Sequence, residues 1–422
     1  MNAKQTTRKG ATRTKPGDFH RISGADRRCA DQLLMRLLKI PGPSGREGQV
    51  SETVQQVLRE AGVKANQIAT DQAHQRSPLK GDIGNLVVNF PGSFSGPRRL
   101  LMAHLDTVPI CVGCRPVKRD NVIRSANPDT GLGADNRAGS AVLLATALRL
   151  MKYSVPHPPI TMLWTVQEEV GLQGARLLKL GLLKKPRFAF NWDGGSAAKI
   201  TIGATGGYRM EIVIRGHASH AGNAPERGVS AIGVAAVAIA DLQRRGWHGA
   251  VAKKGKVGTS NIGVIEGGAA TNVVADHVRL LAEARSHDPD FRQQIVTQIE
   301  DAFQHATQRV TSTDGKRAEI RINGRLDYES FCLPTDHVCV AAAKQAVQSA
   351  GRTAELAVAN GGLDANWLTA RGIPTVSLGC GQKGQHTVEE SMDLREYHSA
   401  CEIAMHLATD SLDNREGGSN GA

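Results

Sequence analysis

Short apolar segments with strand character alternate with longer helical segments over the first 205 residues. "NLVVNF" and "RRLLMAHLDTV" read as buried strands, "NRAGSAVLLATALRLM" as a buried helix and "PPITMLWTVQEE" as the next strand. Alternation of this kind is typical of an α/β fold whose sheet has substantial parallel content. We therefore predict an α/β sheet.

The pattern changes between residues 206 and 325. In chain order this segment gives the strand "GYRMEIVIRG", a helix from "VSAIG", the strands "VGTSNIGVIEGG" and "HVRLLAEARS", a helix from "DFRQQ" and the strand "RAEIRING". The order β-α-β-β-α-β is the ferredoxin-like pattern, and the α/β pattern returns afterwards. We predict that residues 206–325 form a domain inserted into another, which consists of residues 29–205 and 326–415.

The first 28 residues have a composition of their own. They hold eight Lys and Arg against two Asp, a net charge of +6, which is half of the +12 of the whole chain. No apolar core is present, so this is not a secretory signal. We predict a basic, disordered tail, with an organelle transit peptide as the alternative.

The basic balance does not by itself indicate a nucleic-acid-binding protein. The pI is near 9.5, but half of the excess charge is in the tail and only 4% of residues are aromatic, so platforms for stacking bases are scarce. We do not expect nucleic acid to be the main partner. No apolar run approaches the roughly 20 residues of a membrane span, and we expect a cytoplasmic protein that does not bind membranes.

Cys111 and Cys114 form a single C-x-x-C among seven cysteines. No second pair completes a tetrahedral zinc site. A redox dithiol is one interpretation, and two unrelated thiols in a reduced cytoplasm is the other.

Five places put histidine or carboxylate side chains where a predicted strand gives way to a loop. In an α/β sheet, ligands bind beyond the carboxyl ends of the strands, so such loops can converge. Two histidines with several carboxylates suit a zinc-like divalent metal. Singly, each residue has another explanation: a turn, a helix cap or a solvated loop. Their joint occurrence favours a metal site formed by His104 with Asp106, Asp135, Glu168 with Glu169, Asp193 and His386.

At these residues the sequence resembles the M20 family of dinuclear metallopeptidases. The signature runs "HLDTV", "GADNRAG", "EEVG", "WDGG", "GHASHAG" and "GQHT", and the resemblance begins near residue 30. It implies a zinc-dependent exopeptidase-like sheet with helices on both faces, interrupted by a ferredoxin-like dimerisation domain. A homodimer is the expected assembly.

The resemblance also implies roles for the residues at the strand ends. His104 and Asp193 would bind one metal, Glu169 and His386 the other, and Asp135 would bridge the two. Two divalent ions per subunit are expected, zinc with cobalt or manganese as alternatives. Asp106 would support the His104 imidazole, and Glu168 would be the general base that takes a proton from the attacking water.

Further residues are implied to act on substrate. His220 matches the family histidine that steadies the oxyanion in the neighbouring subunit's site, although a surface loop histidine is the alternative. Asn272 and Arg285 resemble substrate-gripping residues, Arg285 as a fork for a carboxylate, although it could be an ordinary strand-end charge. Gly361 and Gly362 would let the backbone approach the substrate, although turn formation would also explain them.

Within the family, residues 360–390 look most like peptidase T-type tripeptidases. The expected activity is therefore removal of the N-terminal residue from short peptides. An N-acyl amino acid deacylase or a carboxypeptidase would use the same metal centre and is the alternative. A non-enzymatic or nucleic-acid-associated protein that keeps the fold is the remote alternative, which the intact set of ligands and base disfavours.

Overall fold

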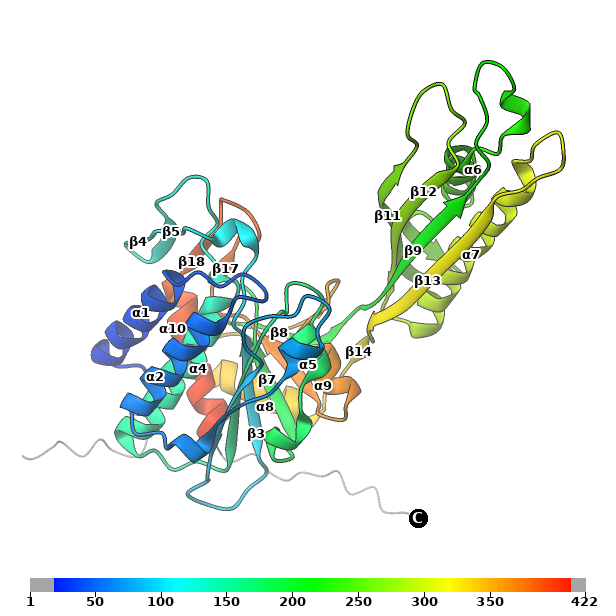
Figure 1. The fold of residues 1–422 in the computed structure, drawn as a ribbon. Coiled ribbons are helices and arrows are strands. Elements are labelled where there is room, and N and C mark those ends of the chain that lie inside the picture. Colours follow the sequence, from blue (N-terminus) through cyan, green and yellow to red (C-terminus); the bar gives the residue numbers. More distant parts are fainter. Residues whose placement is uncertain (1–18, 411–422) are drawn as a thin grey trace, which may run out of the picture.

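The computed structural model describes residues 19–410 (Figure 1). Its largest sheet has nine strands in the order β1-β2-β6-β3-β7-β16-β8-β14, with β15 paired to β8. The neighbours β6, β3, β7 and β16 run parallel, whereas β1, β2 and β14 are antiparallel to their partners. The strands are β1 (Ile68–Thr70), β2 (Leu86–Phe90), β3 (Arg99–His104), β6 (Ile160–Thr165), β7 (Phe188–Trp192), β8 (Lys199–Ala204), β14 (Phe331–Cys332), β15 (Glu355–Ala359) and β16 (Thr375–Leu378).

Helices cover both faces of this sheet, as predicted. Alternate side chains of a strand point to opposite faces, so Leu101 and Ala103 of β3 enter one core while Leu100 and Met102 enter another. The larger core packs against α1 (Gly24–Leu38), α2 (Gly48–Glu60), α4 (Ala134–Tyr153), α8 (Val338–Ser349) and α10 (Leu394–Thr409). The smaller core packs against α5 (Gln173–Leu177) and α9 (Asp364–Ala370), and α3 (Ala73–Arg76) contacts α5.

A small second sheet holds residues 382–393, which include His386, one of the predicted metal ligands. Its order is β17-β18-β5-β4, from β4 (Pro116–Arg119), β5 (Val122–Ser125), β17 (Gln382–Lys383) and β18 (Ser391–Asp393). The loop between β17 and β18 carries His386. Because β18 pairs with β5, this loop lies beside the segment that leads into α4 and Asp135.

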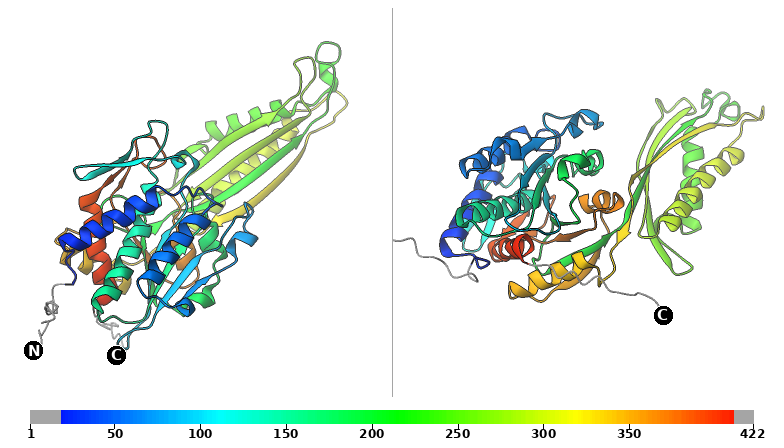
Figure 2. Two further views of the ribbon diagram at one scale, coloured as in Figure 1. Left: turned by 60° about the vertical axis from the view of Figure 1, so that its left-hand side comes forward. Right: turned by 90° about the horizontal axis from the view of Figure 1, so that it is seen from below.

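Residues 206–328 form a five-stranded sheet with its own core. The elements are β9 (Gly206–Arg215), α6 (Ala231–Arg244), β10 (Gly249–Lys253), β11 (Lys256–Gly267), β12 (His277–Ser286), α7 (Pro289–Arg309) and β13 (Glu319–Tyr328), and the sheet order is β10-β11-β12-β9-β13. Apart from β10, this is the expected β-α-β-β-α-β order. The helices α6 and α7 cover one face, and the sheet extends away from the rest of the chain (Figures 1 and 2).

The extra strand β10 was not predicted. It pairs with β11 in a hairpin whose two-residue turn is Lys254-Gly255, both with positive φ, at 51° and 80°. Such turns match the twist of paired strands and favour glycine. The Lys-Gly pair therefore indicated a turn. The five residues of β10, however, lack the continuous apolar pattern that would have predicted a strand.

The predicted tail boundary at residue 28 lies inside a helix. The side chain of Ser23 accepts a hydrogen bond from the Asp26 N–H, so α1 begins at Gly24, as expected for an N-cap serine. Residues 1–18 of the predicted tail are outside the described residues. Within residues 19–410, no helix is both long enough and apolar enough to cross a membrane.

Candidate metal centre

Three of the five predicted ligands, His104, Glu169 and Asp193, lie at the ends of three neighbouring parallel strands. His104 is the last residue of β3, Glu168 and Glu169 follow β6, and Asp193 comes directly after β7. Because β6, β3 and β7 are parallel neighbours, their carboxyl ends lie at one edge of the sheet. The sheet itself therefore brings these residues together, as the sequence pattern predicted.

Side-chain contacts connect four of the five predicted ligands. Nε2 of His104 lies 3.2 Å from Oδ1 of Asp135, and Oδ2 of Asp135 lies 3.4 Å from Nε2 of His386. The same His386 nitrogen lies 3.0 Å from Glu169. Asp135 is thus placed between the two histidines, which is where a bridging ligand is expected.

The fifth predicted ligand, Asp193, lies in the same electrostatic environment. Burial, followed by the nearby Asp135 carboxylate, raises the pKa of Asp193 to about 8. Glu169 also raises it, whereas His104 lowers it. Burial disfavours the charged carboxylate of Asp193, and the neighbouring anions add to this effect.

These residues fit a divalent cation. Donor atoms of His104, Asp135 and Glu169 all lie within 4.8 Å of one another. Oδ1 of Asp135 is buried, and apart from the His104 nitrogen 3.2 Å away it has no partner among the described residues. Buried polar atoms normally have a partner, and a metal ion would supply one. Imidazole and carboxylate donors are those that zinc-like ions accept.

Asp106 is fully buried beneath the site and holds both glutamates as well as His104. Its Oδ1 lies 3.3 Å from Nδ1 of His104 and accepts the N–H of Glu168 at 3.0 Å. Its Oδ2 accepts the N–H of Glu169 at 3.1 Å and the hydroxyl of Ser44 at 2.7 Å. The predicted support for His104 therefore extends to the backbone of the glutamate pair.

The two adjacent glutamates have different surroundings. Gln167 has a φ of 56°, so the regular strand has ended before the pair begins. The Glu169 carboxylate faces His386, whereas no described side chain hydrogen-bonds to the Glu168 carboxylate. Burial, and then the carboxylates of Asp193, Asp364 and Glu169, raise the pKa of Glu168 well above its ordinary value, against the opposing effect of His104.

Glu390 is a functional candidate that the sequence analysis missed. Its buried carboxylate accepts three backbone N–H groups, from Leu132 at 2.8 Å, Gly133 at 2.6 Å and Asp135 at 3.0 Å. It thereby fixes the loop that presents Asp135 while lying four residues after His386. Its position close to His386 was the only feature of the sequence that pointed to this role. The adjacent pair Glu389 and Glu390 otherwise looks like part of a solvated loop.

Asp364 is a second buried acid that the sequence analysis missed. One oxygen accepts the Thr165 hydroxyl, and the other has no partner among the described residues. Burial raises its pKa to about 6. Asp364 lies at the start of α9, two residues after the second predicted substrate glycine, and its charge acts on both Glu168 and Asp193.

The predicted substrate residues do not all lie together in one chain. His220 and Asn272 are exposed at the tip of the inserted domain, where the Asn272 carbonyl accepts the Ala221 N–H at 2.9 Å. Arg285 pairs with Gly207 at the base of the same sheet. The ten residues of β9 connect these ends, a span of about 30 Å at about 3.3 Å per residue.

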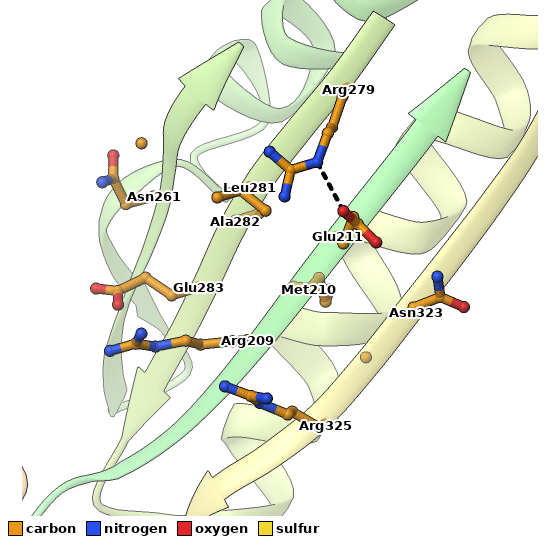
Figure 3. Close-up of a pocket in the computed structure, with 12 residues that line it drawn as sticks. Arg209, Met210, Glu211, Asn261, Arg279, Leu281, Ala282, Glu283, Asn323 and Arg325 are labelled. Carbon is orange, nitrogen blue, oxygen red and sulfur yellow. Dashed lines mark hydrogen bonds and ion pairs between the residues drawn. The ribbon is translucent and has the colours of Figure 1, made fainter. Parts of the chain in front are cut away.

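Arg285 already has a carboxylate partner. Its Nε and Nη2 donate to the two oxygens of Glu283 at 3.0 Å each. Glu283 belongs to the face of the sheet that the helices leave uncovered and lines a concavity of about 640 Å³ there. Figure 3 shows the side chains that line it. The arginines that line this concavity are paired with carboxylates: Arg279 with Glu211 at 2.7 Å, and Arg209 and Arg325 with Asp327. A substrate carboxylate would therefore have to compete with Glu283 for Arg285.

The two predicted substrate glycines differ in their surroundings. A Cβ on Gly361 would meet open space, whereas one on Gly362 would lie 2.5 Å from the ring of Tyr328. Gly362 therefore has a packing reason for lacking a side chain. The neighbouring Asn360 contacts His287 at 3.1 Å, which ties this loop to the base of the inserted domain.

Cys111 and Cys114 are free thiols in this structure. Cys111 is buried, with Sγ 3.7 Å from Oε2 of Glu390. Burial is the largest cause that raises the pKa of both thiols. Because the reactive form of cysteine is the thiolate, these surroundings favour the interpretation as two unrelated thiols over a redox dithiol.

A group of contacting histidines and carboxylates at the carboxyl edge of an α/β sheet is the arrangement of a metal-binding hydrolase. Sequence comparison narrows this class. The profile of peptidase family M20/M25/M40 matches residues 100–410. The chain therefore belongs to this family of peptidases, and the predicted family and enzyme class are confirmed.

Similar proteins include peptidases of different specificity. A tripeptidase from Staphylococcus aureus matches with a TM-score of 0.81 and 30% identity, over 90% of this chain and 97% of that one. The aminopeptidase PepT from Bacillus cereus matches with a TM-score of 0.78 and 31% identity, over 90% and 98%. Carboxypeptidase G2 from Pseudomonas sp. is 30% identical over 245 residues, 56% of this chain and 57% of that one.

Proposed function

We propose that this peptidase removes the N-terminal residue from short peptides, above all tripeptides. The observation that carries the proposal is the group of contacting side chains of His104, Asp135, Glu169 and His386, with Glu168 beside it. The similarity to a tripeptidase and to PepT over nine-tenths of the chain supports this substrate class.

We assign two divalent cations to the site, zinc with cobalt or manganese as alternatives. His104 and Asp193 would hold one, Glu169 and His386 the other, and Asp135 would contact both. Such a pair, when bound, polarises the scissile carbonyl and makes water a nucleophile near neutral pH. Asp106 and Glu390 keep these side chains in place through their hydrogen bonds to the ligand-bearing segments.

Glu168 is the proposed general base. Its carboxylate has no described hydrogen-bond partner, and its raised pKa suits a group that accepts a proton and releases it again. It would take the proton of the attacking water and pass it to the leaving amine. A carboxylate of ordinary pKa would accept a proton much less readily near neutral pH.

His220 is proposed to act in the site of a second copy of this chain. Its Nδ1 accepts the N–H groups of Gly222 and Asn223 at 3.1 Å each, so the ring proton belongs on Nε2. An Nε2–H can donate to an oxyanion. Because the loop lies at the end of the inserted domain remote from its own catalytic domain (Figure 1), a homodimer is needed for this role.

The competing activity is that of a carboxypeptidase, favoured by the similarity to carboxypeptidase G2. The two are separated by which residue is released. Purified protein is incubated with a tripeptide of three different residues, and the products are identified by mass. Release of the first residue supports the proposal. Release of the last residue assigns the chain to the carboxypeptidases, and faster hydrolysis of N-acyl amino acids assigns it to the deacylases.

A further inference from the structure

A second group of metal-ligating side chains lies where the segment before α1 meets the end of α10. Nε2 of His20 is 2.8 Å from Oδ1 of Asp410, and Nδ1 of His406 is 2.8 Å from Oδ2 of the same carboxylate. The donor atoms of all three residues lie within 4.8 Å of one another. Residues 386 positions apart in the chain thus converge on one carboxylate.

The end of α10 is suited to a cation. His406 and Asp410 are four residues apart and so lie on one side of the helix end. The carboxyl end of a helix carries partial negative charge that attracts cations. The side chains of His20, His406 and Asp410 are 19%, 13% and 25% exposed, so an ion could reach them from solvent.

A purely hydrogen-bonded ion cluster is the competing explanation. The two imidazoles stack with ring centroids 4.1 Å apart and planes 9° from parallel. Each neutral imidazole can donate one N–H to an oxygen of Asp410, and Nε2 of His20 also lies 2.9 Å from the Thr409 hydroxyl. The same two neutral imidazoles and the carboxylate form a ligand set that zinc accepts, with water completing the coordination.

A zinc site requires a rearrangement of these side chains. Ligand atoms about 2.0–2.2 Å from a tetrahedral zinc are about 3.3–3.6 Å from one another. The two nitrogens, now 2.8 Å from the carboxylate oxygens, would move apart from them. The stacked rings would also tilt out of parallel so that both nitrogens point at one ion.

The group is separate from the candidate metal centre. Arg99, the first residue of β3, donates to the carbonyl oxygens of Leu407 and Asp410, next to the group. His104, the last residue of β3, belongs to the metal centre. The strand between them spans about 17 Å at about 3.3 Å per residue. Because Arg99 binds carbonyl groups here, the Asp410 carboxylate is left to the two histidines.

We propose that His20, His406 and Asp410 bind one zinc-like divalent cation that joins the segment before α1 to the end of α10. This cation would be additional to those assigned to the peptidase centre and would have a structural role. The proposal does not depend on the peptidase activity, because it concerns different residues.

Zinc titration of the full-length protein, stripped with EDTA and followed by calorimetry, tests the proposal. His20→Gln and His406→Gln are compared with wild type and with His398→Gln. His398 is the matched control, since it lies on the same helix and pairs with a carboxylate, Asp31 at 2.7 Å, that has no second histidine beside it among the described residues. We expect His20→Gln and His406→Gln to bind one zinc fewer per chain than the other two proteins, with peptide hydrolysis unchanged.

Equal zinc stoichiometry in all four proteins would overturn the proposal. His20 precedes α1 and lies outside α10, so His20→Gln keeps the test valid if the His406 variant does not fold; circular dichroism checks this. The test compares the number of zinc ions bound per chain in the variants and does not depend on the total number that the wild type binds. An inactive wild-type protein would therefore refute the peptidase proposal without affecting this one.

Discussion

Glu168 and Asp106 are joined by a hydrogen bond of 3.0 Å from the Glu168 backbone N–H to Oδ1 of Asp106. The other oxygen of Asp106 receives the N–H of Glu169 in the same way. One buried acid therefore fixes the backbone of both glutamates, while their side chains diverge. Glu169 faces His386, and Glu168 is left without a described partner.

This divergence predicts different outcomes for two conservative substitutions. Glu168→Gln should retain the metals and lose roughly 10²–10⁴-fold in kcat, because a general base typically contributes that much. Glu169→Gln should lower the metal content as well, because it removes a charged ligand. Metal analysis of dialysed protein and steady-state kinetics measure the two effects. Equal metal loss in both variants would contradict the assignment of separate roles.

Glu390→Gln should weaken metal binding although Glu390 is not a proposed ligand. The amide has one accepting oxygen, so at least one of the three N–H donors in the loop of Asp135 would lose its partner. An unsatisfied buried donor costs about 1–3 kcal/mol. Both the metal affinity, by competition with a chelator, and the free energy of unfolding should fall.

Glu389→Gln is the matched control for this substitution. Glu389 is the exposed neighbour on the same loop, so its variant should resemble wild type in both measurements. If the two variants behaved alike, the three hydrogen bonds of Glu390 would not position Asp135 in solution.

The stability of the metal-free protein should depend on pH through His386. The carboxylates of Asp135 and Glu169 raise the pKa of His386 from 6.5 to about 10. Protonated His386 therefore stabilises the folded state fully below pH 6.5, and this contribution is lost as pH rises towards about 10. The side chain is 52% exposed, so solvent screening keeps the contribution small.

Urea unfolding of metal-free wild type and His386→Gln measures this contribution. The difference in free energy of unfolding should be larger at pH 6 than at pH 10. Zinc affinity of the wild type should rise over the same interval, since the ion must displace the His386 proton. A difference between the two proteins that stays constant with pH would refute the role of this proton.

The sequence predicts the strand ends of the metal centre well, for a physical reason. The apolar segments that end at His104, Glu168 and Asp193 are strands buried on both faces, so their limits are visible in the residue pattern. Parallel strands then bring the polar residues to one edge. The family and fold class predicted from these residues are confirmed. The metal and catalytic roles of individual residues stay predictions.

Other features depend on contacts that a residue pattern does not encode. Glu390 meets the N–H of Leu132 across 258 positions of sequence, so its role could not be recognised beforehand. Gly362 is required by the ring of Tyr328, which is the last residue of β13 in the inserted sheet. The pairing of Arg285 with Glu283, by contrast, could have been inferred, because residues two apart on a predicted strand share a face.

His220 predicts complementation between two inactive variants. If His220 acts in the site of a second copy, His220→Ala and Glu168→Gln chains should each be nearly inactive alone. A mixed dimer would contain one site with both groups intact. Mixing the two variants should therefore restore part of the activity. The absence of recovery, with subunit exchange demonstrated by mass spectrometry, would argue for action within one chain or for no catalytic role.

The proposed tripeptide specificity requires a fixed distance between the metal centre and an anchor for the peptide's C-terminal carboxylate. Arg285 is the candidate anchor, at the base of the inserted domain beside the loop of Asn360 and Gly361. An extended residue spans about 3.3–3.6 Å. A peptide one residue longer or shorter would misplace its scissile bond by that distance, and a misplacement of even about 1 Å can cost roughly 100-fold in rate.

Tripeptides should therefore be hydrolysed faster than dipeptides and pentapeptides, and amidation of the C-terminus should slow the reaction. Arg285→Ala should remove this preference while leaving the metal content unchanged. Glu283→Gln is the complementary variant. Because Glu283 occupies the Arg285 guanidinium at 3.0 Å, weakening that pair should free the anchor and lower KM for tripeptides. Rates that do not depend on peptide length in the wild type would exclude Arg285 as the anchor, and unchanged KM in Glu283→Gln would show that the two residues do not compete for substrate.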